Sequence, residues 1–170
     1  MMPRARLQKI RDEMTRSTYP TISLQYVSKN SFIPAENEFI KWINIISQTI
    51  EIKRKNITIR IVDASESQEL NKQFRGQDHP TNVLSFPSEL PKEIEPDYLG
   101  DIIICAPIVE AEAGAQNKSV RAHWAHMLVH GVLHLKDYDH LLTEAAEEME
   151  SLEIRILADI GFPDPYEDRV

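Results

Sequence analysis

Apolar and polar positions alternate in two separate stretches of the first third of the chain. Ile22, Leu24 and Tyr26 are spaced by polar residues, and residues 57–61 repeat the arrangement with three isoleucines. A period of two is typical of β-strands with one buried face. Between these strands, after Pro34, apolar residues recur every three or four positions, which predicts a helix. The helical stripe consists of Phe39, Trp42, Ile43, Ile46 and Ile50.

The middle of the chain predicts a second helix and two more strands. Ser65 and Gln68 have the spacing of a capping box, which places the start of this helix beside them. Arg75 and Gly76 end it, since glycine is favoured just after a helix. The predicted strands cover residues 83–86, closed by Pro87, and 101–105, with an acidic, proline-bearing loop at 91–96 between them.

The last third of the chain predicts helices alone. They are expected at residues 108–115, at 120–135, and over a stripe of Met149, Leu152, Ile156 and Ile160 that Gly161 and Pro163 end. Strands gathered in the first two thirds and helices at the end predict an α+β fold. We expect a single domain over residues 20–170, with a small mixed sheet of about four strands covered by helices. Residues 1–19 have weak periodicity and predict a frayed N-terminal extension, helical in part.

Composition limits the classes of protein to which this chain can belong. There is no apolar run long enough for a spanning helix, and the basic N-terminus lacks the apolar core of a secretory signal. The single cysteine, Cys105, fits a reducing compartment. We therefore expect a cytoplasmic protein without a membrane partner.

The charge is divided unevenly along the chain. Residues 1–85 carry 13 basic and 9 acidic residues, net +4, and residues 86–170 carry 6 and 18, net −12, which together give −8. A net negative charge argues against coating nucleic acid through bulk charge. It leaves open a local site for a phosphate.

The strongest chemical signal is a group of three histidines within eleven residues: His130, His134 and His140. Histidines four residues apart lie on one face of a helix, so both rings can reach one ion. His140 follows a predicted turn and completes a three-histidine set. Three protein ligands that leave a fourth position to water are the pattern of catalytic zinc, so we expect one Zn²⁺. The chain's three other histidines, His79, His123 and His126, are left out of the ligand set.

The same histidine spacing occurs in metallopeptidases of the H-E-x-x-H-x-x-G-x-x-H type. Those enzymes place a glutamate general base directly after the first histidine, where this chain has Gly131. Their later glycine corresponds to Asp137, a residue type that tolerates left-handed backbone. Asp139 is either a partner that orients a histidine or a surface turn residue. The peptidase hypothesis is weakened but stays open.

A second polar group lies between residues 74 and 86. Arg75 follows the predicted helix, and an arginine can present a planar fork to a phosphate. Thr81, Asn82 and Ser85 can add hydrogen bonds. The alternative for Arg75 is an ion pair with a residue such as Asp101.

Several motifs in one order resemble the bacterial YbeY endoribonucleases. They are Phe74-Arg75-Gly76, Pro80 to Pro87, Leu99 to Ile102, Ala122 to His126, His130 to Leu135, Tyr138 to His140, Glu147 to Glu150, Gly161-Phe162 and Asp164 to Tyr166. The resemblance extends from about residue 20 to 166, and the family usually has glycine where this chain has Asp137.

The resemblance implies a zinc-dependent, single-strand-specific endoribonuclease. Its role would be maturation of the 3′ end of small-subunit ribosomal RNA and ribosome quality control. The zinc ligands would be His130, His134 and His140, and the functionally important arginine would be Arg75. The implied partners are single-stranded RNA, the small ribosomal subunit, a ribosomal protein and an assembly GTPase. The alternative is a non-catalytic ribosome-assembly factor whose zinc is structural, with Asp137 or Asp139 as a fourth ligand.

Overall fold

A four-stranded mixed sheet forms the centre of the molecule, in the strand order β1-β2-β4-β3. The computed structural model describes residues 4–7, 18–53, 55–91, 93–94, 97–138 and 142–168. The strands are β1 (Thr21–Tyr26), β2 (Asn56–Val62), β3 (Val83–Pro87) and β4 (Tyr98–Cys105). β1, β2 and β4 are parallel, and β3 runs antiparallel to β4 at the edge. The predicted α+β fold with a small mixed sheet is confirmed.

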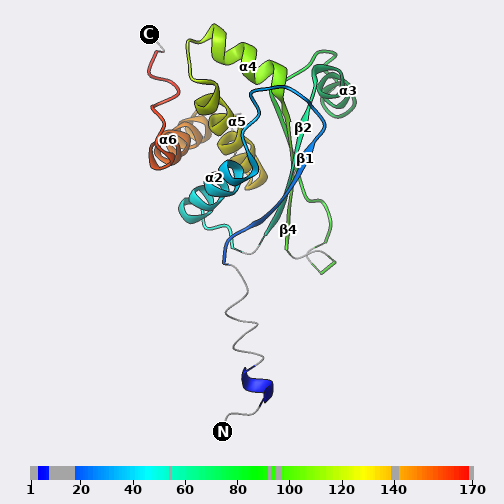
Figure 1. Ribbon diagram of the computed structural model, residues 1–170, viewed down its shortest axis with the longest axis vertical. Coiled ribbons are helices and arrows are strands. Elements are labelled where there is room, and N and C mark those ends of the chain that lie inside the picture. Colours follow the sequence, from blue (N-terminus) through cyan, green and yellow to red (C-terminus); the bar gives the residue numbers. More distant parts are fainter. Residues whose placement is uncertain are drawn as a thin grey trace.

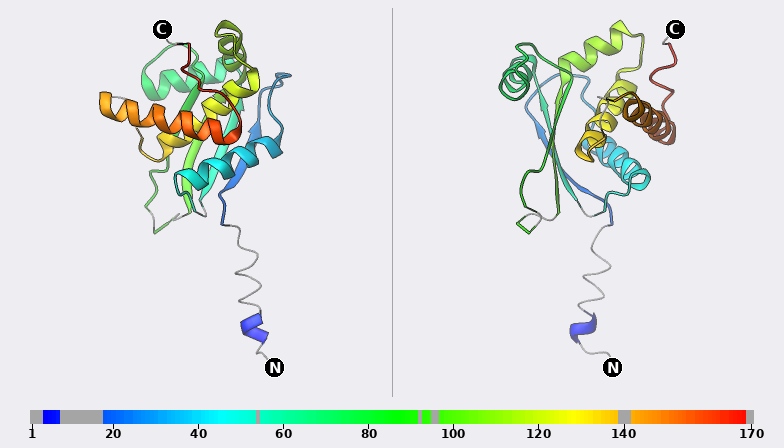
Figure 2. Two further views of the ribbon diagram at one scale, coloured as in Figure 1. Left: turned by 90° about the vertical axis from the view of Figure 1, so that its left-hand side faces the viewer. Right: turned by 180° about the vertical axis from the view of Figure 1, so that it is seen from behind.

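Helices cover the sheet unequally on its two faces (Figure 1). The helices are α2 (Glu36–Thr49), α3 (Ala64–Arg75), α4 (Ala106–Ala115), α5 (Val120–Leu135) and α6 (Thr143–Ile160). α2, α5 and α6 lie on one side and α3 on the other, and views from two further directions agree (Figure 2). In the part of the chain that the structure describes, no helix is long and apolar enough to cross a membrane.

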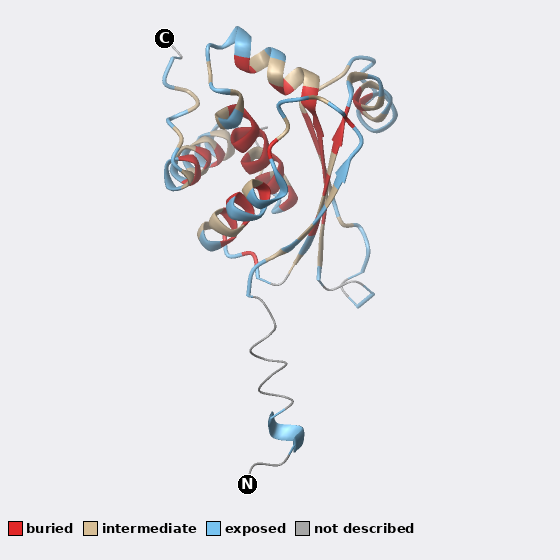
Figure 3. Ribbon diagram, viewed as in Figure 1, coloured by how far each residue is buried: buried red, intermediate tan, exposed pale blue. Residues whose placement is uncertain are grey.

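Successive side chains of β4 point to opposite faces of the sheet and contribute to an apolar cluster on each face. Ile102 and Ile104 belong to the large apolar cluster beneath α2, α5 and α6. Ile103 and Cys105 belong to a smaller cluster on the opposite face, which Leu70 of α3 helps to cover. Buried residues accordingly gather between the sheet and α5 (Figure 3). The helix α5 is buried along most of its length, so its polar residues are held in defined positions.

Two local predictions differ from the structure. The capping box at Ser65 is wrong: α3 begins at Ala64 with Asp63 at the N-cap position, and Gln68 Nε2 donates to Asp78 instead. β4 begins three residues before the predicted Asp101. Gly100 adopts a φ of +147°, and a Cβ there would overlap the carbonyl oxygen of Phe86 on β3. Strand pairing therefore continues through a glycine that local propensity treats as a break.

The N-terminal extension is described only in part. Residues 4–7 are helical, and residues 8–17 lie outside the described residues. The division into an extension and one domain stays a prediction.

Candidate metal centre

The packing of α5 on the sheet decides where its histidines point. The carbonyl of Gly131 accepts a hydrogen bond from Ser85 Oγ on β3 at 2.9 Å. A Cβ at position 131 would lie only 2.9 Å from Ile102 Cγ2. Glycine is thus what allows α5 to approach the sheet so closely. With position 131 against the sheet, His130 and His134 lie on a neighbouring face of the helix.

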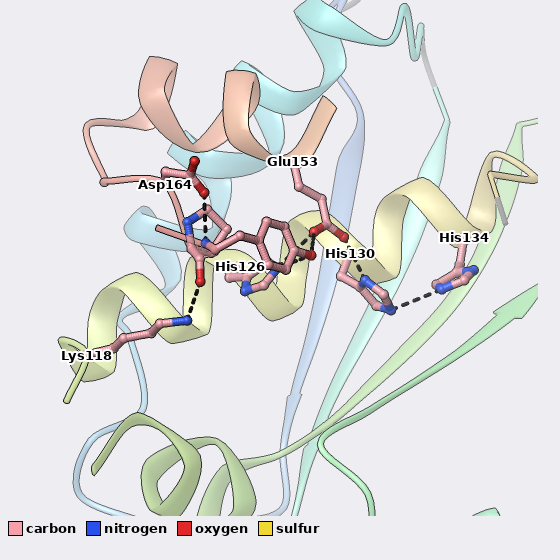
Figure 4. A network of polar contacts seen from close by, with 8 residues as sticks. Lys118, His126, His130, His134, Glu153 and Asp164 are labelled. Carbon is pink, nitrogen blue, oxygen red and sulfur yellow. Dashed lines mark hydrogen bonds and ion pairs between the residues drawn. The ribbon is translucent and has the colours of Figure 1, made fainter. Parts of the chain in front are cut away.

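His130 and His134 direct the same ring atom at each other. Their Nε2 atoms are 3.0 Å apart (Figure 4). Two nitrogens bound to one tetrahedral zinc ion stand about 3.3 Å apart, as follows from bond lengths of about 2.0–2.1 Å. The His130 side chain is 26% exposed, so the pair is accessible from solvent. These two nitrogens fit one metal ion.

A buried glutamate on α6 is hydrogen-bonded to Nδ1 of His130, the ring nitrogen that does not face His134. Glu153 is 1% exposed, and its Oε1 accepts a hydrogen bond from His130 Nδ1 at 2.7 Å. Its Oε2 lies 2.9 Å from His126 Nε2 and also accepts from the Tyr166 hydroxyl. Burial acts to raise the pKa of Glu153, but the hydrogen bonds from His126 and His130 outweigh it and lower the pKa to about 2.

The ionised state of Glu153 fixes the protons of its neighbours. A carboxylate only accepts, so the nitrogens that face it, His130 Nδ1 and His126 Nε2, carry the hydrogens. When His130 is neutral, its other nitrogen, Nε2, carries the unprotonated lone pair, and this is the atom aimed at His134. A histidine whose second nitrogen is held by a carboxylate is a common arrangement at metal sites.

The histidines excluded from the ligand set have partners of their own. His126 bonds to Glu153, as described above. His123 Nε2 lies 2.7 Å from Glu112 Oε2 on α4, and Asn82 Nδ2 donates to both oxygens of Glu112. Burial tends to raise the pKa of Glu112, and the bonds from His123 and Asn82 lower it overall. This second carboxylate–histidine pair does not include His130.

A cavity of about 450 Å³ adjoins His130. His130 forms part of its wall, together with Asn82, Glu112, Lys118, His126 and Tyr166. Its walls carry both charge signs and several hydrogen-bonding groups. Space for a ligand therefore exists directly beside the candidate metal site.

The third predicted ligand, His140, and the adjacent Asp139 lie outside the described residues. Among the residues that are described, no group of three or more His, Cys, Asp or Glu side chains is arranged to hold a metal ion. The predicted turn after α5 is present: Asp137 has a φ of 64°, in the left-handed region. Its N–H donates to the carbonyl of His134 at 3.0 Å. The role of His140 stays a prediction.

Arg75 is carried by a different element from the histidine pair. It is the last residue of α3 and is exposed. The preceding Phe74 packs edge-on against Phe86 of β3, with ring centroids 5.0 Å apart. Asp101, the alternative partner for Arg75, accepts a hydrogen bond from Tyr98. Arg75 is thus anchored beside the edge strand, and its guanidinium faces solvent.

The polar residues expected to assist Arg75 have structural roles. Ser85 bonds to the carbonyl of Gly131, and Asn82 bonds to Glu112. The carbonyl of Thr81 accepts from Ser67 Oγ. These contacts fix α3, α4 and α5 around the edge strand.

Sequence reasoning missed Glu153 and Tyr166. The signal for Glu153 was present, because it falls on the apolar stripe between Met149 and Ile156, where a charged residue is unusual. Tyr166 follows the last helix and gives no comparable signal. Only the folded chain brings Glu153 to His130 and Tyr166 to Glu153.

Comparison with known proteins identifies the family and supports the fold of this chain. The family model described as Endoribonuclease YbeY matches residues 23–161. The chain belongs to the YbeY endoribonuclease family. The solution structure of TM1509 from Thermotoga maritima is 29% identical and superposes with a TM-score of 0.58, covering 82% of this chain and 89% of that one. The region matched to the YbeY family includes Arg75, all three predicted ligands and Glu153, whereas Tyr166 lies beyond it.

Proposed function

We propose that this chain is a zinc-dependent endoribonuclease specific for single-stranded RNA. The observation that carries the proposal is the pair of Nε2 atoms 3.0 Å apart on α5, with one ring held from behind by a buried carboxylate. Membership of an endoribonuclease family supplies the substrate class. The inferred role is maturation of the 3′ end of small-subunit ribosomal RNA and ribosome quality control in the cytoplasm, with the small subunit, a ribosomal protein and an assembly GTPase as partners.

The zinc ligands in this proposal are His130, His134 and His140. When bound, zinc supplies a Lewis acid and a double positive charge beside the scissile phosphodiester. Three neutral imidazoles leave that charge uncompensated, so the site attracts a phosphate although the protein is acidic overall. Glu153 keeps the proton of His130 on Nδ1 and so keeps Nε2 available as a ligand.

Arg75 is proposed to bind the RNA backbone. A guanidinium offers a fork of donors that matches a phosphate, and its permanent charge stabilises the charge that develops during phosphodiester cleavage. Its exposed position at the end of α3 leaves the guanidinium accessible to RNA. No side chain is assigned as the general base, because position 131 packs against Ile102 of the sheet.

Specificity for single strands is consistent with the shape of the site. The His130 ring is only partly exposed and borders a cavity of about 450 Å³. A flexible strand can bend one phosphate towards such a site and splay its bases, whereas a duplex holds its phosphates on a stiff outer surface. The close contact at position 131 also disfavours a peptidase, which needs a glutamate there.

Cleavage of a designed RNA tests the proposal. The substrate has a labelled duplex stem and a single-stranded 3′ tail, and it is incubated with zinc-loaded wild-type protein, the His130→Ala variant and the His79→Ala variant. His79 is exposed and bonds to the nearby loop residues Gln77 and Pro80, so its variant is the matched control. We expect cuts confined to the tail in wild type and His79→Ala, and loss of cleavage in His130→Ala.

Other outcomes would overturn the proposal. Equal cleavage by all three proteins would indicate a contaminating nuclease. Absence of cleavage in zinc-loaded wild type would favour the assembly factor with structural zinc, which also predicts that chelation unfolds the domain. A casein digest under zinc tests the peptidase alternative in the same preparations.

A further inference from the structure

We propose that Glu153 is the positioning residue of the metal centre and that Tyr166 couples the C-terminal segment to it. The inference rests on the proposed function in that it assumes a metal at His130 and His134. It assigns a task to two side chains that bind no metal themselves. It also gives the segment after α6 a role in the site.

First, a continuous series of polar contacts connects Tyr166 with the histidine pair. The Tyr166 hydroxyl donates to Glu153 Oε2, Glu153 Oε1 accepts from His130 Nδ1, and His130 Nε2 meets His134 Nε2. Figure 4 displays this chain of contacts, which runs from the C-terminal segment through α6 to α5. A change at Tyr166 therefore reaches the proposed ligand atom through two hydrogen bonds.

The second step is the chemistry at Glu153. A carboxylate removed from water is costly unless donors surround it, and here His126, His130 and Tyr166 supply them. The geometry in turn restricts His130 to one tautomer and one ring orientation. Hydrogen bonding to an anion also makes the opposite nitrogen a stronger ligand. Removal of such a partner commonly weakens metal binding about 10- to 100-fold.

The third step is the anchoring of the C-terminal segment. Lys118 Nζ donates to the carbonyl of Pro165 at 2.5 Å, which ties the segment to the start of α5. Asp164 Oδ1 accepts from the N–H of Tyr166 at 2.8 Å, and the Tyr166 ring stands edge-on to His126 with centroids 5.4 Å apart. The Phe162 ring packs against Trp42 of α2. Tyr166 is thus held at both its backbone and its ring, and its hydroxyl has a defined target.

The test compares isosteric variants of two carboxylates, on α6 and α4, that both bond to histidines of α5. Glu153→Gln removes the charge next to His130, and Glu112→Gln removes it from the pair with His123, which does not contact His130. Zinc dissociation constants are measured by competition with a chromophoric chelator, and melting temperatures of the metal-free proteins are measured in parallel. The visible absorption spectrum of the cobalt-substituted proteins reports the ligand geometry without any assay of activity.

We expect Glu153→Gln to weaken zinc binding about 10- to 100-fold and to alter the cobalt spectrum. Glu112→Gln should change zinc affinity less than about threefold even if it lowers the melting temperature equally, since it leaves His130 untouched. Tyr166→Phe should weaken zinc binding several-fold, less than Glu153→Gln, because both histidine donors to the carboxylate remain. If Glu153→Gln does not fold, Tyr166→Phe decides the question by the same measurements.

Equal zinc affinities in wild type and Glu153→Gln would overturn the inference, as would equal losses in Glu153→Gln and Glu112→Gln. An unchanged affinity in Tyr166→Phe would overturn the role of the C-terminal segment. The failure of the proposed function is a separate result. It would be seen as wild-type protein that binds no zinc, or as zinc-loaded wild type that does not cleave RNA.

Discussion

Substitution of Gly131 by alanine tests how closely α5 packs against the sheet. An added Cβ would lie 2.9 Å from Ile102 Cγ2 and 3.3 Å from Ser85 Oγ. Ile102 is fully buried in β4, and a β-branched side chain has few other rotamers available, so it cannot move aside freely. Overpacking of this kind costs about 1–3 kcal/mol. Alanine recovers about 1 kcal/mol of helix propensity relative to glycine, which leaves a net loss of about 0–2 kcal/mol.

Gly114 offers a matched control. It lies inside α4, and a Cβ there would meet nothing within 4 Å. Gly114→Ala should therefore raise the free energy of unfolding by up to about 1 kcal/mol through propensity alone. The two variants should differ by about 1–3 kcal/mol, the overpacking term. At this chain length each kcal/mol corresponds to about 2–4 °C in melting temperature.

Urea unfolding of the metal-free proteins, followed by circular dichroism, measures both changes without a contribution from bound metal. A double variant with Ile102→Ala adds a second check, because removal of Cγ2 should lessen the penalty at position 131. If Gly131→Ala stabilises the protein as much as Gly114→Ala, the close approach of α5 to β4 is refuted. Position 131 could then accommodate a larger side chain, and a general base there would no longer be excluded.

Three further predictions concern other parts of the molecule. Arg75→Ala should lower kcat/KM for single-stranded RNA by about 10- to 1,000-fold with little change in melting temperature, since exposed charges contribute little stability; equal losses of activity and stability would contradict a role in binding phosphate. The pKa of Glu112 is lowered from its ordinary value of 4.5, so its contribution to stability is present above pH 4.5 and is lost as the pH falls through the lower folded pKa. Urea titrations between pH 5 and pH 3 should therefore show a larger loss in wild type than in Glu112→Gln, and parallel losses would refute the shift. Asp137→Gly should raise the melting temperature, because Asp137 has a left-handed φ of 64° that glycine adopts at lower cost, and a lower melting temperature would count against that turn.

Local periodicity was sufficient for most of the elements. The period of two predicted β1 and β2, and the helical stripe predicted α2, because one face of each element is less exposed than the other. Tyr26, at the end of β1, departs from this pattern and is exposed. The bounds of α5 agree with the prediction at both ends, Val120 and Leu135. The start of β4 was missed because pairing with the neighbouring strands decides it, and local propensity does not include that pairing. The N-cap of α3 was missed because Gln68 bonds to Asp78 in the following loop instead of closing a capping box.

Part of the candidate site could also be predicted from the sequence, and part could not. His130 and His134 could be predicted because a spacing of four residues fixes their separation within one helix. The contacts of Glu153 with His130 and of Tyr166 with Glu153 depend on how α6 and the C-terminal segment pack on α5, which no local pattern encodes. Strand order is also a tertiary property, so the packing of α3 and α5 on opposite faces of the sheet was not foreseen.

The most direct test of the account is the rate of RNA cleavage measured against bound zinc. Metal-free protein is titrated with zinc, the ions bound per chain are measured by elemental analysis, and the initial rate of cleavage of a single-stranded RNA is followed at each point. The account predicts a rate that rises with occupancy and reaches its plateau at one zinc ion per chain. A rate that is independent of bound zinc would contradict it.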